Sequence, residues 1–321
     1  MIDVEGYFLE ITKRRLGFIG LGAMGGAMCT HLLKADYGVT GFDVAGPALA
    51  AFGKEGGNVT TGPAEAARGV GLLVVMVHNE AQVERVLFGQ GHEQGAADTL
   101  ASGAVVWVAS TVSPDYASKL ERRLANRSLY LIDGPVSGGL TGAQAGTLTI
   151  MASGHPDALV LAEPVMRTCA TTVHKVGAQA GAGSQIKLIN QLLTATHIAL
   201  TAEAVAFGTR AGLDPHVLTE VISQSAGRSF QFEKRAPRMV AGDHAKHSTV
   251  NIFLKDLEIA LEAARQLRFP TPLTATAHQV FTMAAGLGLA MESDTRVLDV
   301  YERNGGVDVA QAGREHEDKH D

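Results

Sequence analysis

The sequence predicts an α/β protein with an N-terminal Rossmann-type, doubly wound domain and a C-terminal all-helical domain, the two joined by a long helix. Between residues 16 and 153, short apolar runs alternate with helical patterns, as in βαβ units that build a parallel sheet. Residues 72–77 are apolar throughout, so this strand needs cover on both faces. After about residue 177, strand patterns give way to alanine, leucine and isoleucine at helical spacing, which continues to residue 301.

Six strands and the main helices follow from these patterns in chain order. The expected strands cover residues 16–19, 39–42, 72–77, 105–109, 129–132 and 148–152. A helix over residues 27–34 follows the first strand. A long helix over residues 184–211 ends at Gly212, and Asp214 caps the next helix with Pro215 at its first position.

The change from strand to helical patterns sets the expected domain boundaries. We expect a nucleotide-binding domain over residues 14–177 and a helical domain for substrate binding and oligomerisation over residues 178–303. Residues 304–321 carry scattered charges and few apolar side chains. Such a segment buries too little apolar surface to offset the entropy of ordering, so we expect a disordered tail.

Composition and charge exclude several functional classes. The chain has 321 residues, of which 46% are hydrophobic and 19% charged, as expected of two soluble domains. A net charge of −6 argues against a nucleic-acid partner. Cys29 and Cys169 cannot form a disulfide framework, so we expect a cytoplasmic location. Residues 1–15 lack the apolar core of a signal peptide, and residues 192–206 are too short an apolar stretch to cross a membrane.

A glycine-rich loop between the first strand and its helix is the strongest local motif. Gly20, Gly22 and Gly25 have the spacing in which glycines allow a tight turn, a close approach to pyrophosphate and close helix packing. The start of the following helix places backbone N–H groups near the anion. We therefore expect a dinucleotide to contact Gly20, Gly22, Ala23, Met24 and Gly25. An accidental glycine-rich turn is the alternative.

Polar residues at later strand ends extend this expected cofactor site. Asp43 ends the second strand about 20 residues after the loop, where a carboxylate binds the adenine ribose 2′-OH and repels a 2′-phosphate. No Arg or Lys follows until Lys54, which favours NAD over NADP. Alternatively, Asp43 caps the turn into Pro47. Ligands of such sheets lie beyond the carboxyl ends of the strands, which adds His78, Asn79 and Thr111.

Four motifs together resemble the β-hydroxyacid dehydrogenase family, which includes 3-hydroxyisobutyrate dehydrogenase, tartronate semialdehyde reductase and, more distantly, 6-phosphogluconate dehydrogenase. They are the glycine-rich loop, D-G-P-V-S-G-G at residues 133–139, the helix start at residues 181–190 and K-D-L at residues 255–257. The resemblance spans residues 16–299. It implies an NAD-dependent oxidoreductase that acts on a small hydroxyacid.

The second motif implies a site for the substrate carboxylate at Ser137, Gly138 and Gly139. Consecutive small residues let backbone N–H groups converge on an anion, and the serine hydroxyl adds a donor. A simple glycine turn between strands is the alternative. Asp133 and Pro135 are interpreted as residues that shape this loop, with no direct chemistry.

The third motif implies that Lys187 is the catalytic general base. Oxidation of an alcohol removes the hydroxyl proton as hydride leaves the carbon, and a lysine accepts that proton when burial and nearby cations lower its pKa. A solvated lysine on the helix face is the alternative. Asn190 and Gln191 share the helix face of Lys187. Family members differ in which of these two positions holds the asparagine, and we assign Asn190 to orient the substrate hydroxyl.

The fourth motif implies that Lys255 contacts both substrate and nicotinamide, with Asp256 beside it at the cofactor. A surface lysine paired with Asp256 is the alternative interpretation. Asp243, His244 and His247 carry metal-ligating groups, but no further signature residue accompanies them and the family chemistry needs no metal. We therefore expect no metal site.

Finer similarities indicate one branch of the family, the L-threonate dehydrogenases. They lie at residues 84–89, 196–199, 225–235 and 247–253. This resemblance implies NAD-dependent oxidation of L-threonate to 2-dehydro-L-erythronate, with 3-hydroxyisobutyrate dehydrogenase and tartronate semialdehyde (2-hydroxy-3-oxopropionate) reductase as alternatives. A polyol acid needs side-chain partners for its additional hydroxyls, and the candidates are Gln231, Arg235, His247 and Ser248.

Two other functional classes and an assembly state were also weighed. A non-catalytic dinucleotide-binding sensor and an imine reductase resemble this type of sequence, but those relatives lack the lysine that Lys187 provides. The resemblance implies a homodimer or homotetramer that forms through the helical domain. The apolar helix at residues 188–207 would leave exposed apolar surface in a monomer.

Overall fold

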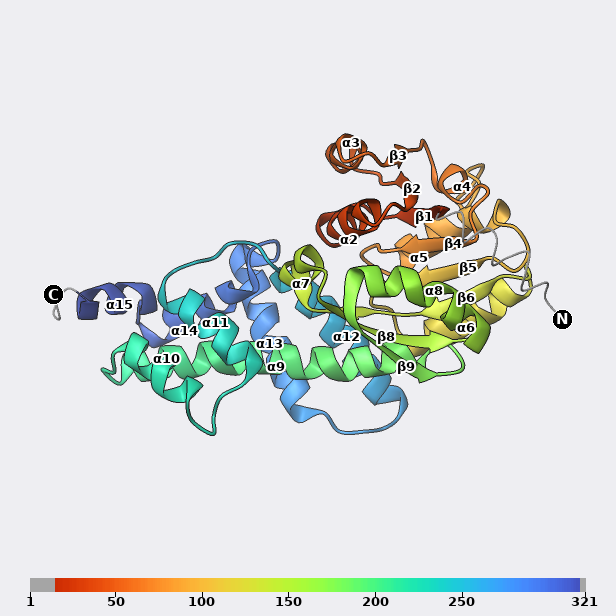
Figure 1. The fold of residues 1–321 in the computed structure, drawn as a ribbon. Helices are drawn as coiled ribbons and strands as arrows, with labels where there is room; N and C mark the ends of the chain where they lie inside the picture. Colours follow the sequence, from red (N-terminus) through yellow and green to blue (C-terminus); the bar gives the residue numbers. More distant parts are fainter. Residues whose placement is uncertain (1–14, 318–321) are drawn as a thin grey trace. The chain divides into compact units, whose positions relative to one another are not determined.

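The structure, a computed structural model, describes residues 15–317 of the chain (Figure 1). It divides into two compact units between Lys187 and Leu188. We call residues 15–187 the sheet unit and residues 188–317 the helical unit. The division falls inside one continuous helix, α9 (Ala182–Arg210), whereas the sequence predicted a boundary at residue 177. The first turn of α9 is hydrogen-bonded to the sheet, which explains why it belongs to the sheet unit.

The sheet unit contains nine strands in the order β3-β2-β1-β4-β5-β6-β8-β7, with β9 paired to β8 (Figure 1). The strands are β1 (Arg15–Ile19), β2 (Gly38–Phe42), β3 (Asn58–Val59), β4 (Leu72–Val75), β5 (Val105–Val108), β6 (Tyr130–Asp133), β7 (Val136–Ser137), β8 (Leu148–Gly154) and β9 (Ala170–Gly177). All six predicted strands are present, with small shifts at their ends. The prediction missed the short strands β3 and β7, and it missed β9 because half of its residues are exposed and they follow no apolar pattern.

Strands β1 to β6 are parallel and form the predicted Rossmann-type sheet. β8 runs antiparallel to β6 and β7, whereas β9 runs parallel to β8. A parallel crossover needs a dozen or more residues, but the chain between β7 and β8 has room only for the short helix α7 (Gly139–Ala145). The reversal follows from this short connection. β7 keeps the register of β6 on β8, so the two form one strand that is interrupted at Gly134 and Pro135.

Helices cover both faces of the sheet, as the doubly wound prediction required. Besides α7, the helices are α2 (Ala23–Lys34), α3 (Gly46–Lys54), α4 (Pro63–Ala66), α5 (Glu80–Phe88), η1 (Ala96–Asp98), α6 (Pro114–Ala125) and α8 (Pro156–Cys169). On β4, Leu72 and Val74 join the core that includes α2 and α8. Leu73 and Val75 join the opposite core, which includes α5 and α6. The cover predicted for both faces of this strand is confirmed.

The helical unit begins with the remainder of α9. Its other helices are α10 (Pro215–Ser223), α11 (Phe230–Val240), α12 (Val250–Gln266), α13 (Pro272–Ala284), η2 (Ala285–Leu289), η3 (Asp294–Val297), α14 (Leu298–Gly305) and α15 (Val309–Glu317). Small residues of α9 and the rings of Phe253 and Phe281 contribute to its core. The predicted cap of α10 is confirmed, because Asp214 Oδ1 accepts a hydrogen bond from the N–H of His216 at 2.8 Å and Pro215 lies in the first turn.

The prediction of a disordered tail is wrong for its described part. α14 ends at Gly305, and α15 extends the fold to residue 317. Val309 is fully buried in the helical unit, and its N–H donates to Glu302 Oε1 at 2.8 Å. Asp308 caps α15 by accepting a hydrogen bond from the N–H of Gln311 at 2.7 Å. One buried side chain and a capped helix start thus order a polar segment, while residues 1–14 and 318–321 lie outside the described residues.

The apolar part of α9 extends beyond the stretch recognised in the sequence. Of the described helices, α9 alone is long and apolar enough to cross a membrane by length and composition. A core helix of a globular protein passes the same test. Ala195, Ile198 and Ala202 on α9 are fully buried in the core of the helical unit, which is the arrangement of a core helix.

Candidate active site

The glycine-rich loop joins β1 to α2 and leaves open space at one glycine. Gly20 has a φ of +95°, and a Cβ there would lie 2.1 Å from the carbonyl oxygen of Met76. A Cβ on Gly25 would lie 1.9 Å from the carbonyl oxygen of Gly20, so the fold itself requires glycine at both positions. A Cβ on Gly22 would meet nothing within 4 Å. The space beside Gly22 is therefore available to a ligand that approaches the backbone closely.

The start of α2 has the properties of an anion site. Gly22 occupies the cap position, no side chain caps the helix, and no acidic residue lies in its first turn. The first N–H groups of a helix have no partners within the helix and lie at the positive end of its dipole. Those of Ala23 and Met24 therefore fit the pyrophosphate of a dinucleotide, as the spacing of the glycines predicted.

Asp43 follows β2 and ties the glycine-rich loop to the next turn. Its Oδ2 accepts a hydrogen bond from the N–H of Leu21 at 2.6 Å, and its Oδ1 accepts one from the N–H of Ala45 at 2.8 Å. The alternative role of Asp43 in the turn toward Pro47 is therefore confirmed. Ribose binding is compatible with this role, because a half-buried carboxylate offers about four acceptor sites and two are used here.

The ends of β4 and β5 lie at the same edge of the parallel sheet as the glycine-rich loop. Asn79 caps α5, because its Oδ1 accepts a hydrogen bond from the N–H of Gln82 at 2.9 Å. The exposed His78 donates its backbone N–H to Gln82 Oε1 at 2.8 Å. Thr111 follows β5 and is half-buried. The topology thus brings these three predicted cofactor residues and Asp43 to one edge of the sheet.

The predicted carboxylate site is a turn that leads from β7 into α7. Ser137 ends β7 and is half-buried, whereas Gly138 and Gly139 are exposed. The two glycines have φ values of +129° and +61°, which other residues rarely adopt. The alternative of a glycine turn therefore describes the backbone correctly. Anion binding is compatible with that turn, because small exposed residues leave its backbone accessible.

Two contacts hold the segments on either side of this turn. Trp107 Nε1 donates to the carbonyl oxygen of Gly134 at 2.8 Å, and a Cβ on Gly134 would lie 2.5 Å from that indole nitrogen. His31 Nε2 on α2 lies 2.9 Å from the carbonyl oxygen of Gln144 on α7. A carbonyl oxygen only accepts, so Nε2 carries the proton in this contact. The helix that follows the glycine-rich loop therefore also holds α7, the helix that follows the turn at residues 137–139.

Lys187 lies in the second turn of α9 and is only 7% exposed. The alternative of a solvated lysine on the helix face is therefore wrong. Lysine side chains are rarely buried to this extent unless their amine has a specific partner or function.

A buried carboxylate fixes the start of α9. Asp133 ends β6 and is 1% exposed, and its Oδ2 accepts hydrogen bonds from the N–H groups of Gly181 at 2.9 Å and Ser184 at 2.8 Å. Ser184 Oγ donates to Asp133 Oδ1 at 2.6 Å. Ser153 Oγ donates to Asp133 Oδ2 at 3.2 Å and accepts from the N–H of Gly183 at 2.9 Å. Burial raises the pKa of the Asp133 carboxyl, and the hydrogen bonds from Ser184, Gly181 and Ser153 oppose that rise.

A second polar network lies within the helical unit and contains three predicted site residues. Asn190 Nδ2 donates to Gln191 Oε1 at 3.1 Å, and Gln191 Nε2 donates to Asp256 Oδ2 at 2.5 Å. Lys255 Nζ lies 2.7 Å from Asp256 Oδ1. The side chain of Asp256 is 2% exposed and that of Lys255 is 19% exposed. The alternative interpretation thus identified a real pair, but the pair is largely buried and not on the surface.

Gln191 is the member of this network to which the sequence prediction gave no role. It is 7% exposed and links Asn190 to Asp256. Its spacing of four residues from Lys187 was a usable signal, but the resemblance gave the role to an asparagine. Asp256 is shared by Gln191 and Lys255, so its carboxylate orients both side chains. A direct contact of Asp256 with the cofactor, which the sequence predicted, thus stays a prediction.

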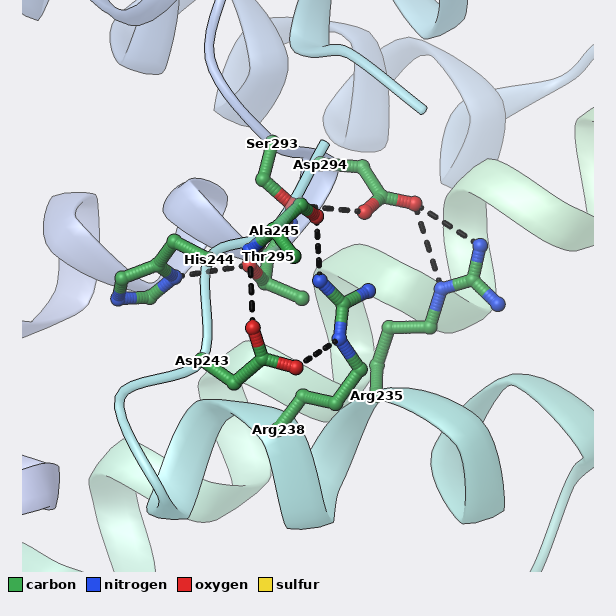
Figure 2. Close-up of polar contacts among 8 residues, drawn as sticks. All are labelled: Arg235, Arg238, Asp243, His244, Ala245, Ser293, Asp294 and Thr295. Atoms are coloured by element: carbon green, nitrogen blue, oxygen red, sulfur yellow. Dashed lines mark hydrogen bonds and ion pairs between the residues drawn. The ribbon is translucent and has the colours of Figure 1, made fainter. Parts of the chain in front are cut away.

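Figure 2 shows a polar cluster that holds the loop between α11 and α12. Arg235 Nη2 donates to Asp294 Oδ2 at 2.9 Å, and Asp294 is fully buried. Arg238 donates to Asp243 Oδ2 through Nε at 3.0 Å and to the carbonyl oxygen of Ala245 through Nη2 at 2.6 Å. These contacts fix the chain that leads into α12 and Lys255. The guanidinium of Arg235, a predicted partner of substrate hydroxyls, is thus paired with Asp294.

His244 belongs to the same cluster and bonds through Nδ1 to Thr295 Oγ1 at 2.8 Å (Figure 2). Burial lowers the pKa of His244, and the nearby positive charges of Arg296 and Arg238 lower it further. His244 and Asp243, considered above as metal-ligating groups, therefore brace the loop. Within residues 15–317, no group of three or more His, Cys, Asp and Glu side chains is placed to hold a metal ion.

The other candidates for substrate hydroxyls differ in their surroundings. His247 is exposed, and Ser248 is half-buried with its carbonyl oxygen accepting from the N–H of Asp294 at 3.1 Å. Gln231 Oε1 is buried and has no hydrogen-bond partner among the described residues. A buried acceptor without a partner costs about 1–3 kcal/mol. Gln231 Oε1 is therefore an unsatisfied acceptor, and because it is shielded from solvent, a ligand hydroxyl would reach it only after the side chain moves.

Known proteins are similar to this chain over both units. Residues 15–177 match the NAD binding domain of 6-phosphogluconate dehydrogenase, and residues 181–301 match the family described as NAD-binding of NADP-dependent 3-hydroxyisobutyrate dehydrogenase. An L-threonate dehydrogenase from Cupriavidus necator is 43% identical over 90% of this chain and 96% of its own length. An L-threonate dehydrogenase from Escherichia coli is 39% identical over 89% of this chain and 94% of its own length.

A solved structure extends the similarity to three dimensions. The 3-hydroxyisobutyrate dehydrogenase of Salmonella typhimurium has a TM-score of 0.82 and is 38% identical, over 89% of this chain and 99% of that chain. The parallel sheet with its glycine-rich loop and the helical unit that carries Lys255 are both accounted for by these matches. This chain therefore belongs to the 3-hydroxyisobutyrate dehydrogenase-like family of hydroxyacid dehydrogenases, oxidoreductases that act on CH–OH groups with NAD or NADP.

Proposed function

We propose that this chain is an NAD-dependent L-threonate dehydrogenase, which oxidises carbon 2 of L-threonate to give 2-dehydro-L-erythronate. The observation that carries the proposal is the burial of Lys187, on a helix whose start Asp133 fixes to the sheet that bears the glycine-rich loop. The similarity to L-threonate dehydrogenases over both units supports the choice of substrate.

The residues that we assign to the two halves of the cofactor follow strands β1, β2, β4 and β5 of the sheet. We assign the pyrophosphate to the glycine-rich loop with Ala23 and Met24, the adenine ribose to Asp43, and the nicotinamide half to His78, Asn79 and Thr111. The negative charge of Asp43 favours NAD, because it would repel the 2′-phosphate of NADP. When bound, the nicotinamide ring accepts the hydride from the substrate.

The chain's own residues hold the substrate and move its proton. We assign the carboxylate to Ser137, Gly138 and Gly139. Asn190 and Lys255 orient the reacting hydroxyl. Lys187 Nζ accepts the hydroxyl proton as the hydride leaves carbon 2, and it returns a proton in the reverse reaction. Positioned acid–base groups of this kind contribute about 10²- to 10⁴-fold to a rate.

Gln231 is assigned to the hydroxyls beyond the reacting carbon. L-Threonate carries such hydroxyls on carbons 3 and 4, whereas 3-hydroxyisobutyrate has no hydroxyl besides the one that reacts. A site that hydrogen-bonds a substrate hydroxyl discriminates strongly against an analogue that lacks it, because its buried polar group is then left unpaired. The Oε1 of Gln231 has no partner among the described residues and would become such a group once the side chain turns toward the substrate.

Initial rates on a panel of acids test the proposal. NADH or NADPH formation is measured by absorbance with NAD and NADP in separate reactions, on L-threonate, D-erythronate, 3-hydroxyisobutyrate, glycerate and L-serine. We expect selective turnover of L-threonate with NAD. Turnover of 3-hydroxyisobutyrate alone would keep the mechanism and replace the substrate, and equal rates with NADP would contradict the role of Asp43.

Two further results would assign a different function. Reduction of tartronate semialdehyde with NADH, without oxidation of L-threonate, would identify the third candidate substrate. Tight NADH binding with no turnover of any acid would instead indicate a non-catalytic dinucleotide sensor. Both measurements use the full chain from the same preparation.

A cytoplasmic homodimer or homotetramer is part of the proposal. Ile189, Leu193, Leu200 and Phe207 follow one face of α9 and are 54%, 50%, 58% and 75% exposed. An exposed apolar stripe of this kind is typical of a subunit interface. Sedimentation velocity should therefore show a dimer or tetramer at micromolar concentration, and a monomer would contradict the assembly proposal.

A further inference from the structure

We propose that Asp133 is a positioning residue for Lys187. Its buried carboxylate fixes the first turn of α9 on the sheet, both in position along the helix axis and in rotation about that axis. This inference rests on the proposed role of Lys187 as general base. It replaces the interpretation from sequence, in which Asp133 only shapes the turn toward Ser137.

The start of α9 depends on a cap from a distant strand. Gly181, the residue before the helix, has a φ of +112° and no side chain with which to cap it. Asp133 supplies the missing acceptor from 48 residues earlier in the chain. Its Oδ2 accepts the N–H groups of Gly181 and Ser184, which would otherwise lack partners at a buried helix end. A residue that is distant in sequence therefore caps the start of α9.

The first turn of α9 is packed against the sheet at backbone distance. A Cβ on Gly183 would lie 2.3 Å from the carbonyl oxygen of Met151 and 2.5 Å from that of Asp133. The N–H of Gly183 also donates to Ser153 Oγ, which in turn donates to Asp133. Three N–H groups of one turn, those of residues 181, 183 and 184, are thus held by two strands. These hydrogen bonds restrict translation of the first turn along the helix axis and its rotation about that axis.

Helix α6 secures the residue just before this turn. Ala180 donates its N–H to Glu121 Oε1 at 2.9 Å, and its carbonyl oxygen accepts from Ser118 Oγ at 3.1 Å. A Cβ on Gly181 would lie 2.8 Å from Ser118 Oγ, so the approach is close. These contacts restrict movement of residues 180 and 181, through which the chain enters α9. We call these hydrogen bonds to residues 180–184 the anchor of α9, and the Asp133 carboxylate is its central acceptor.

A displacement of the anchor would be transmitted to Lys187. Ser184 precedes Lys187 by three residues, about 4.5 Å along the axis, and both lie on one face of a continuous helix. A misplacement of a reacting group by about 1 Å can cost about 10²-fold in rate. Asp133 is also the last residue of β6, which continues into the turn at Ser137 and Gly138. One residue thus connects the proposed base with the proposed carboxylate site.

A double-mutant cycle separates positioning from general stability. The variants are Asp133→Ala, Lys187→Ala and both together, assayed on whichever acid of the panel the wild-type chain turns over fastest. We expect Asp133→Ala to lower kcat about 100-fold while the affinity for NADH is retained. In the Lys187→Ala background the same substitution should have no further effect on kcat, because the positioned amine is already absent.

Conservative and matched variants complete the test. Asp133→Asn keeps one oxygen that can accept both N–H groups, so it should recover most of the lost kcat. Asp214→Ala removes the cap of α10 in the helical unit, so it should lower thermal stability without a change in kcat. If Asp133→Ala does not fold, Ser153→Ala removes one link of the anchor and enters the same cycle with a smaller expected loss.

The outcomes distinguish the two proposals. An equal loss of kcat from Asp133→Ala with and without Lys187 would overturn the positioning role and leave the general base intact. Full activity of Lys187→Ala alone would overturn the proposed function. A loss of NADH binding in parallel with kcat would show that Asp133 supports the whole sheet unit, and it would also overturn the positioning role.

Discussion

Each unit contains a buried aspartate close to a lysine of the proposed site, and the two aspartates make different kinds of contact. Asp133 in the sheet unit accepts backbone N–H groups and thereby fixes the helix that carries Lys187. Asp256 in the helical unit lies beside the ammonium group of Lys255 and accepts the amide of Gln191. Both residues are 1% exposed. The sheet unit thus places its functional residue through the backbone, and the helical unit places its own through side-chain pairs.

This difference extends to the surroundings of each aspartate. In the sheet unit, close backbone contacts at Gly20, Gly25 and Gly183 leave no room for any side chain. In the helical unit, the pair of Arg238 and Asp243 holds the loop before α12, and the pair of Arg235 and Asp294 joins α11 to η3. We therefore expect added volume to disrupt the sheet unit most, and altered charge to disrupt the helical unit most.

The largest expected effect is a loss of folding after a single added methyl group in the glycine-rich loop. In Gly25→Ala the new Cβ would lie 1.9 Å from the carbonyl oxygen of Gly20, so the backbone must move and the sheet unit should unfold or lose much of its stability. Gly22→Ala is the matched control, because a Cβ there meets nothing within 4 Å. It should melt like the wild type but bind NADH more weakly. Normal NADH binding by Gly22→Ala would contradict the assigned cofactor site.

A smaller but clear effect is expected when the charge of Asp256 is removed. Loss of one partner of a buried ion pair costs about 3–5 kcal/mol. Because the Lys255 side chain is 19% exposed, the free energy of unfolding of Asp256→Asn should fall by about 3 kcal/mol, the lower end of that range. Urea unfolding measures this change.

The exposed pair of Lys246 and Glu292 provides the control for Asp256. Its two side chains are 54% and 41% exposed, at an N–O distance of 2.9 Å. Glu292→Gln should therefore change the free energy of unfolding by less than about 1 kcal/mol. Equal effects of the two substitutions would show that the helical unit does not depend on its buried charges, and would remove the contrast between the units.

The smallest expected effect is a pH dependence of stability that involves His244. Burial lowers its pKa in the folded chain, so the folded state binds fewer protons than the unfolded state near the ordinary value of about 6.5. This contribution to stability is present above about pH 6.5 and is lost as the pH falls toward and below the folded pKa. Melting temperatures between pH 8 and pH 5, about the range in which histidine titrates, should therefore decrease less steeply for His244→Asn than for the wild type.

The choice of asparagine makes this test specific. Asparagine can place a polar atom near the position of Nδ1 and keep the contact with Thr295 Oγ1, but it does not titrate. If the melting temperature of His244→Asn falls with decreasing pH as steeply as that of the wild type, other groups cause the loss of stability at low pH.

The local pattern of the sequence predicted most of the sheet unit. Apolar runs identified six strands, and the spacing of Gly20, Gly22 and Gly25 located the loop, because each of these features depends only on neighbouring residues. The exposed strand β9 left no such pattern. The anchor of Asp133 on Ser184 was also missed, because its two ends are 51 residues apart and no local motif marks the contact.

The helical unit was less predictable because its polar side chains have partners far away in sequence. Lys255 and Asn190 were identified through resemblance, but their link through Gln191 and Asp256 follows only from the packing of α9 and α12. Arg235 was expected to contact substrate, although it is paired with the buried Asp294. α15 was taken for a disordered segment, because a single buried valine is not visible as a pattern.

The role proposed for Lys187, a buried lysine on a helix that side chains of the sheet unit hold, is tested by the kcat of Lys187→Ala with NAD and the preferred acid. NADH affinity and melting temperature are measured on the same preparation. We expect a loss of about 10²- to 10⁴-fold in kcat, with NADH affinity and melting temperature close to those of the wild type. A kcat within a few-fold of the wild type would show that Lys187 is not the general base.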